Sequence, residues 1–285
     1  MKHFFYVLLL VPSLLWAQPD QLLGEVSLSQ FQEPPHADWF TKNYQVYKPS
    51  AAIVDMLKAT RHNHLQITIY FGSWCGDSKR EVPRFVKVLA DMGFPLSQVK
   101  FVGVSDSTER YKQSPQRQEA GQHVYRVPTM VITEKDKERN RIVEYPAESL
   151  ERDLLKILKW EPYIPNYYAY PQIAEWLKEG LLADENVNPR GLAGQLFGKV
   201  PSASELNACG YVLLADGRKS EAVAVFRVNT VLFPENANCF DSLGEAYAKC
   251  GWVDRAILAY ERALQLDPTL EQAAAMLKKL KDGQL

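Results

Sequence analysis

Apolar positions in the first half of the chain fall into strand-like runs, separated by polar segments and by stretches with helical spacing. The runs predict two buried parallel strands and a terminal hairpin, at 65–71, 99–104, 129–133 and 141–144. Helical spacing predicts a first helix over 50–59 and a closing helix over 150–158. This order of elements predicts an α/β fold in which helices flank a central mixed sheet. The polar stretch 107–122 exceeds a minimal connection. It is either a loop over the functional edge of the fold or a solvated insertion, and the insertion is the simpler interpretation.

The second half of the chain shows an internal repeat with helical periodicity. The same residue types recur at a spacing of 34 residues in 206–234 and 240–268. The matching pairs are Gly210 with Gly244, Gly217 with Gly251, Ala222 with Ala256, Phe226 with Tyr260, and Leu232 with Leu266. This period is typical of tetratricopeptide repeats, whose paired helices need small residues where they cross. An amphipathic helix over 269–281 is expected to cap them, so the predicted all-α repeat domain spans 204–282.

The segment 161–203 connects these two predicted domains. Prolines and tyrosines alternate over 161–170, a helix is expected over 171–182, and a glycine-rich loop over 186–204. The tyrosines form either a binding surface or a clasp between the domains. We favour the clasp, because buried aromatic side chains chiefly supply packing area.

Length and charge set broad limits on function. A chain of 285 residues with 46% hydrophobic content is long enough for two domains. Lysine and arginine number 33 against 34 aspartates and glutamates, so no overall field favours nucleic acid or an anionic membrane surface. We therefore expect protein or peptide partners and no nucleic acid.

The N-terminus predicts an exported protein. Lys2 and His3 precede an apolar run over 4–16 that is short for a bilayer span, and a small residue follows at Ala17. We expect a signal peptide over 1–17, an N-terminal extension over 18–47, and no membrane span after cleavage. The alternative is an uncleaved membrane anchor. Export to the periplasm or out of the cell would bring the chain into oxidising conditions, where disulfides persist.

The strongest chemical signal is Cys75, which follows a predicted strand and precedes a predicted helix. Free backbone N–H groups and the positive end of the helix dipole stabilise a thiolate at such a position, and the thiolate attacks disulfides. Lys79 and Arg80 are expected to strengthen this effect, whereas Asp77 opposes it. The sequence therefore predicts a candidate nucleophile at Cys75.

The segment around Cys75 resembles the active site of the thioredoxin superfamily. The matching features are the run Trp74-Cys75-Gly76-Asp77-Ser78, Pro83 in the following helix, and Val127-Pro128-Thr129 before an apolar strand. The resemblance covers 48–160 and implies a thioredoxin-like fold, in which Pro128 is cis, faces the cysteine and lies beside a free backbone edge that pairs with an extended substrate. It implies catalytic roles for Trp74, Cys75, Ser78 and Pro128, and substrate contacts at Gly76, Asp77, Val127 and Thr129.

Two positions depart from the family pattern. Ser78 stands where the family has a resolving cysteine, and Ile69 stands where it has a buried acid. Because a hydroxyl cannot resolve a mixed disulfide at Cys75, an external thiol must do so. No spacing singles out a base among the three histidines considered: His62, His64 and His123.

The other cysteines lie in the predicted repeats, where structural roles are expected. Cys209 occupies an inward repeat position and is interpreted as a small core residue. Cys239 and Cys250 lie on one predicted helix at a separation of about 16 Å, which is too far for a disulfide between them. Their disulfide state otherwise stays open.

The repeats are expected to be an independently folded platform that binds a short extended peptide. Asn207, Asp241 and Glu245 are candidate partner-binding residues, expected to be exposed on the first helices of the pairs. The leading hypothesis for the whole chain is a monothiol thiol–disulfide oxidoreductase with a protein or peptide substrate. The alternatives are a non-catalytic protein-binding module and a peroxide-reactive thiol protein. No cofactor and no metal are expected.

Overall fold

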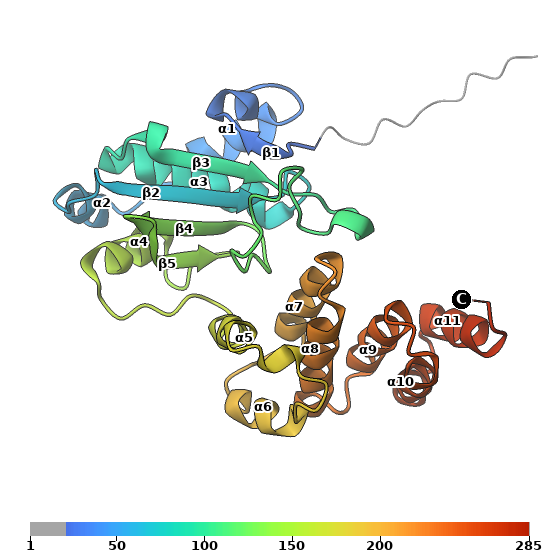
Figure 1. Ribbon diagram of the computed structural model, residues 1–285. Helices are drawn as coiled ribbons and strands as arrows, with labels where there is room; N and C mark the ends of the chain where they lie inside the picture. The colour runs from blue at the N-terminus through green and yellow to red at the C-terminus, as the bar shows by residue number, and fades with distance from the viewer. Residues whose placement is uncertain (1–20, 285) are drawn as a thin grey trace, which may run out of the picture.

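The computed structural model describes residues 21–284, which form a sheet unit followed by a helical unit (Figure 1). The predicted signal peptide lies outside the described residues. The sheet has the order β1-β3-β2-β4-β5, in which β2 and β3 are parallel and the other neighbouring pairs are antiparallel. The strands are β1 Gly24–Val26, β2 Leu65–Phe71, β3 Val99–Gly103, β4 Thr129–Glu134 and β5 Lys137–Val143. The mixed sheet is confirmed, although β5 begins four residues before the predicted 141 because a two-residue turn at 135–136 already reverses the chain.

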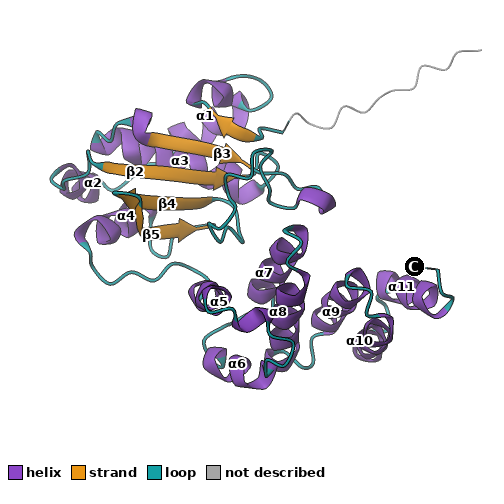
Figure 2. Ribbon diagram, viewed as in Figure 1, coloured by secondary structure: helices purple, strands orange, loops and turns teal. Residues whose placement is uncertain are grey.

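Four helices cover one face of the sheet (Figure 2). They are α1 Ala37–Val46, α2 Ala51–Lys58, α3 Gly76–Met92 and α4 Leu150–Lys159. Alternate residues of the strands, such as Ile67, Ile69 and Ile132, point into the core below these helices. The inward position of Ile69 explains why a carboxylate is not needed there, since an unpaired acid in this core would cost stability.

The segment expected as an N-terminal extension belongs to the sheet unit. Strand β1 pairs with β3, and the ring of Phe31 lies 5.0 Å from Phe71 and 5.2 Å from Phe101 between ring centroids. Phe40 of α1 completes this aromatic cluster. The sheet unit therefore begins before residue 48, because the strand needs an edge partner and the core needs these rings.

The segment between β3 and β4 covers part of the other face of the sheet. It is not the solvated insertion expected over 107–122, because several of its polar residues are buried: Lys112, Gln113, Ser114 and Glu119. Glu119 satisfies this burial by accepting hydrogen bonds from the backbone N–H and the hydroxyl of Ser114. Backbone bonds between Ser105 and residues 112–113 close the start of the segment into a compact loop.

The helical unit contains two helix pairs and a closing helix, preceded by two connector helices. Its helices are α5 Ala169–Lys178, α6 Pro189–Leu196, α7 Ser204–Ala215, α8 Lys219–Leu232, α9 Ala237–Lys249, α10 Val253–Leu266 and α11 Glu271–Lys281. Helix α6 corrects the loop expected over 186–204, and its signals are an Asn188 side-chain cap and Pro189 at the first turn. Helix α5 begins two residues before the predicted 171.

One buried hydrophobic cluster includes residues of both units, while independent folding of the repeat platform stays a prediction. Tyr125 and Val143 of the sheet unit lie in the same buried cluster as residues of α5, α7 and α8. Tyr170 packs edge-on against Tyr125 with 5.1 Å between ring centroids, and Tyr167 stacks on Tyr170. The connector tyrosines therefore form a clasp between the units.

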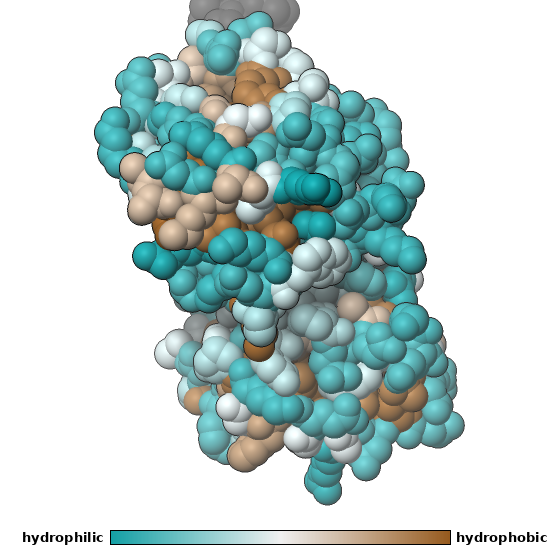
Figure 3. Space-filling view, turned by 90° about the vertical axis from the view of Figure 1, so that its left-hand side faces the viewer, coloured by the Kyte–Doolittle hydropathy of each residue, from teal (hydrophilic) through white to brown (hydrophobic). Residues whose placement is uncertain are grey.

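No helix among residues 21–284 is long and apolar enough to cross a membrane. The surface seen in Figure 3 is mostly hydrophilic, with smaller apolar areas on both units.

The crossing of α7 and α8 tests the packing argument. A Cβ added at Gly210 would lie 2.4 Å from the fully buried ring of Phe226, so Gly210→Ala is expected to destabilise the protein by about 1–3 kcal/mol. Gly194→Ala in α6 is the matched control, because no atom lies within 4 Å of the added Cβ and alanine favours the helix by about 0.5–1 kcal/mol. Urea unfolding of both variants measures the difference, and equal effects would contradict the assigned crossing.

Candidate functional site

Strand register places the Cys75 motif and the Val127-Pro128-Thr129 motif at the same edge of the sheet. Tyr70 near the end of β2 is opposite Thr129 at the start of the antiparallel β4. The residues that follow β2 and those that precede β4 therefore emerge side by side. Cys75 is the N-terminal cap residue of α3, and its backbone N–H bonds the carbonyl of Gly72 in the intervening turn.

The Cys75 thiol faces the predicted proline loop. Its Sγ donates a hydrogen bond to the carbonyl oxygen of Val127 at 3.3 Å, and the Val127–Pro128 peptide bond is cis. The thiol therefore lies between the first turn of α3 and the loop that precedes β4.

The neighbours of Cys75 hold the turn in place. The indole N–H of Trp74 donates to the carbonyl of Val104 at 2.8 Å, and the fully buried Ser78 hydroxyl accepts from the N–H of Gly72 at 3.2 Å. Thr129 donates to the carbonyl of Arg126 at 2.7 Å, which fixes the start of β4. Three of the sequence-predicted site residues therefore have clear structural contacts around the thiol.

The opposing charges near Cys75 form an ion pair with each other. Arg80 binds Asp77 at 2.7 Å and also contacts the buried Glu81. Because its guanidinium is shared by two carboxylates, Arg80 is less available to Cys75 than the sequence suggested. Gly76 is exposed at the first position of α3, beside this pair.

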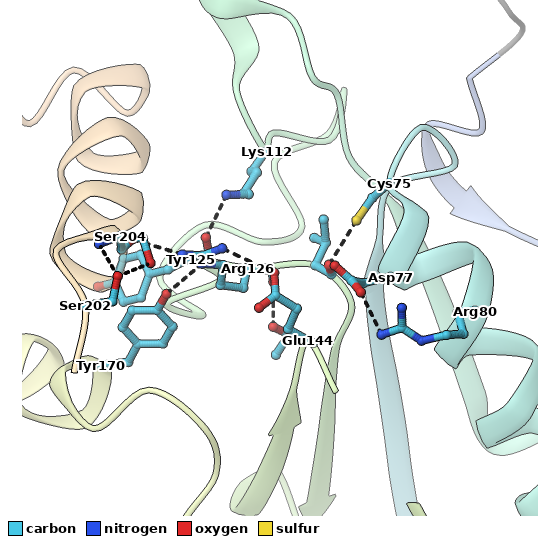
Figure 4. A network of polar contacts seen from close by, with 12 residues as sticks. Cys75, Asp77, Arg80, Lys112, Tyr125, Arg126, Glu144, Tyr170, Ser202 and Ser204 are labelled. Carbon is cyan, nitrogen blue, oxygen red and sulfur yellow. Dashed lines mark hydrogen bonds and ion pairs between the residues drawn. The ribbon is translucent and has the colours of Figure 1, made fainter. Parts of the chain in front are cut away.

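Arg126 is a residue of this site that sequence reasoning missed. Its guanidinium donates to the hydroxyl of Tyr170 at 3.1 Å, to Glu144 at 3.2 Å, and to the carbonyl of Ser204 at 3.0 Å (Figure 4). It also lies over the ring of Tyr167. One side chain thus links the loop before β4, whose Val127 carbonyl contacts the thiol, to the end of β5, to the connector and to the first repeat helix. Its partners come from distant segments, so no local pattern marks it.

Lys112 is the second residue that sequence reasoning missed. Only 4% of its surface is exposed, and its ammonium donates to the carbonyl of Tyr125 at 2.7 Å and to the hydroxyl of Tyr111 at 2.8 Å. Burial, together with the nearby Arg126, lowers the pKa of Lys112 to about 7. A buried ammonium is costly, because water solvates it better than two neutral acceptors do.

None of the three histidines considered as bases has a contact that directs it at Cys75. His62 bonds the hydroxyl of Thr60, His64 pairs with Glu134 at 2.8 Å, and His123 bonds the hydroxyl of Tyr125. Burial lowers the pKa of His123, as do the nearby arginines. These contacts explain the histidines without catalysis.

The candidate partner residues of the repeats are half-buried rather than exposed. Asn207 bonds Ser242 and accepts from Asn229, so its amide ties neighbouring helices together. Glu245 accepts from the hydroxyl of Tyr211 at 3.0 Å and pairs with Lys249 at 2.9 Å. Asp241 lines a cavity next to Glu245. Inter-helix packing reduces the exposure of all three, which sequence alone does not show.

All four cysteines are free, and they differ in access. Cys209 and Cys239 are buried, and burial raises the pKa of both thiols. Cys250 is half-buried, and its pKa is also raised by burial. Within residues 21–284, no group of three or more histidine, cysteine or acidic side chains is arranged to hold a metal ion.

Comparison with known proteins gives a match within the helical unit. Residues 237–270 match the tetratricopeptide repeat family, and this match covers α9 and α10. No curated protein matches the chain. The C-terminal region is therefore a tetratricopeptide-repeat region, a class of structure whose stacked helices offer binding surfaces for proteins.

The buried charge of Lys112 predicts a pH-dependent stability difference. Its pKa falls from 10.5 to about 7 on folding, so the unfolded chain holds the extra proton between these values and stability rises with pH. Relative to Lys112→Met, the unfolding free energy of the wild type is expected to increase by up to about 1.4 kcal/mol per pH unit above pH 7.

Urea unfolding at several pH values between neutral and alkaline measures this difference. The exposed Lys42→Met is the control, and its difference from the wild type should stay constant with pH. A pH-independent difference for Lys112→Met as well would show that Lys112 folds with an ordinary proton affinity.

Proposed function

We propose that the chain is an exported, thioredoxin-like thiol–disulfide oxidoreductase with a single active cysteine, Cys75, and that its repeats hold the protein substrate. The observation that carries this proposal is the contact between the Cys75 thiol, at the N-terminus of α3, and the carbonyl before the cis Pro128. These two features are 52 residues apart in the sequence, and they adjoin neighbouring antiparallel strands of the mixed sheet, β2 and β4. Export is inferred from residues 1–17 alone.

The proposed reaction is a two-step exchange. The Cys75 thiolate attacks one sulfur of a substrate disulfide, a new sulfur–sulfur bond forms, and the other substrate sulfur leaves as a thiolate that takes up a proton. An external thiolate then attacks the substrate sulfur of the mixed disulfide, and Cys75 leaves as the thiolate. Each step breaks one disulfide and forms one, so no further oxidant is required. Ser78 takes no part in resolution, because its hydroxyl cannot replace a thiol.

A second candidate function is protein binding without catalysis. The match of residues 237–270 to the tetratricopeptide repeat family favours it, because the stacked helices of such repeats offer binding surfaces for proteins. In that case the proline loop would dock an extended peptide, and the tetratricopeptide repeats would bind the same partner. The two candidates differ in one property, which is covalent reaction at Cys75.

Reaction with glutathione disulfide distinguishes the two candidates. The wild type is expected to gain one glutathione, detected by mass spectrometry as an adduct on Cys75, and Cys75→Ser should gain none. Cys250→Ser is the matched control for the other half-buried thiol and should react like the wild type. An unmodified Cys75 in folded protein, under conditions that modify a model thiol, would favour binding without catalysis.

Ser78→Cys tests the assignment of Ser78 to the resolving position. Ser78 lies one helical turn after Cys75, and its hydroxyl is buried against the turn before α3. The slightly larger thiol of the variant is expected to occupy the same position. An internal thiol has a high effective concentration, so the glutathione adduct of this variant is expected to decay at least about a hundred times faster than that of the wild type. Mass spectrometry over time measures the decay. Equal lifetimes in a folded variant would refute the assignment.

A further inference from the structure

A groove runs along the repeats on the side that faces the sheet unit. Its central cavity, about 520 Å³, lies between the loop after β3, at Asp106 and Tyr111, and the helices α7 and α9, at Tyr211 and Glu245. A second cavity of about 530 Å³ shares Glu245 and Lys249 with it and continues toward α11. The two cavities form the outer part of the groove.

The inner end of the groove lies next to the thiol site. A third cavity of about 340 Å³ shares Tyr111 and Tyr211 with the central one and is also lined by Lys112 and Arg126. Arg126 directly precedes Val127, the residue whose carbonyl accepts the Cys75 thiol. Burial raises the pKa of Tyr111, and the nearby Cys75 adds to this shift. A chain lying in the groove would therefore reach Arg126, on the loop whose Val127 carbonyl contacts Cys75.

The outer part of the groove carries unbalanced negative charge. Four carboxylates line it: Asp106, Glu109, Asp241 and Glu245. Lys249 is the one cation among the residues that line these two cavities. Lys249 is already paired with Glu245. Asp241 has no hydrogen-bond or ion-pair partner among the described residues, and its pKa is raised by burial and by the charge of Glu245. Among the described residues, Asp106, Glu109 and Asp241 therefore have no ion-pair partner, and Glu245 pairs with the one lysine of this outer part.

We propose that this groove binds an extended, positively charged segment of the substrate protein and places a cysteine of that segment beside Cys75. Arginine or lysine side chains of the segment would pair with Asp241 and Glu245, and the rings of Tyr111 and Tyr211 would flank their stems. An extended chain turns alternate side chains to one side, so it can fill successive cavities. The position of the cysteine rests on the proposed function, whereas the charge selection does not.

Binding is measured without thiol chemistry, by fluorescence anisotropy on the Cys75→Ser protein. The probes are two labelled synthetic peptides with one serine at the position of the cysteine, one rich in arginine and one with glutamate in place of arginine. The arginine peptide is expected to bind, more weakly as salt rises, and the glutamate peptide is not. The double variant Asp241→Asn with Glu245→Gln should bind the arginine peptide about tenfold more weakly.

Two controls keep the test sharp. Glu185→Gln removes an exposed carboxylate outside the groove and should leave binding unchanged, and Asp241→Asn alone replaces the double variant if that protein does not fold. Equal binding of the two peptides, or binding unaffected by the groove variants, would overturn the proposal. When Cys75 is kept, the groove variants should react about tenfold more slowly than the wild type with an arginine peptide disulfide. They should react with glutathione disulfide at the same rate as the wild type. Peptide binding with no reaction toward either disulfide would instead refute the proposed function and support the groove.

Discussion

The arrangement of the two units and of the thiol site depends on the contacts of the Arg126 guanidinium. It is held by Tyr170, Glu144 and the carbonyl of Ser204, and these groups come from the connector, the end of β5 and the first repeat helix. The next residue, Val127, carries the carbonyl that meets the thiol. Removing one partner of this partly buried charge network leaves the others unpaired, so the loss of any one contact destabilises the whole arrangement. The first repeat helix therefore contributes to the geometry of the thiol site.

This arrangement places the Cys75 thiol between two elements. It lies at the N-terminus of α3 and donates to the Val127 carbonyl, and Asp77 with Arg80 forms a nearly neutral pair beside it. The Val127 carbonyl lies on the loop that the inner end of the groove touches through Arg126. In the proposed function, a peptide bound in the groove would therefore act on the loop that contacts Cys75, and this loop would link binding to reaction.

Much of the fold could be predicted from periodicity, and less of the site could. The sequence indicated the position of Cys75 at a helix start and the closeness of Val127 and Pro128, because strand order and local turns determine both. It could not indicate Arg126 or Lys112, since their burial results from packing between segments far apart in the chain. The same packing explains why the loop over 107–122 is buried. Helix α6 was missed because its glycines outweighed the cap at Asn188.

Hydrogen–deuterium exchange of the Arg126→Met variant tests most directly whether Arg126 joins the thiol site to the repeats. The two segments to follow are the loop over 124–128, which carries Arg126, and helix α7, whose first residue accepts a hydrogen bond from it. They lie in different units. The account predicts that both segments lose protection together, by similar factors, while α10 and α11 keep theirs. Loss of protection in the loop alone, with α7 unchanged, would show that the two units hold their positions independently and would contradict the central claim.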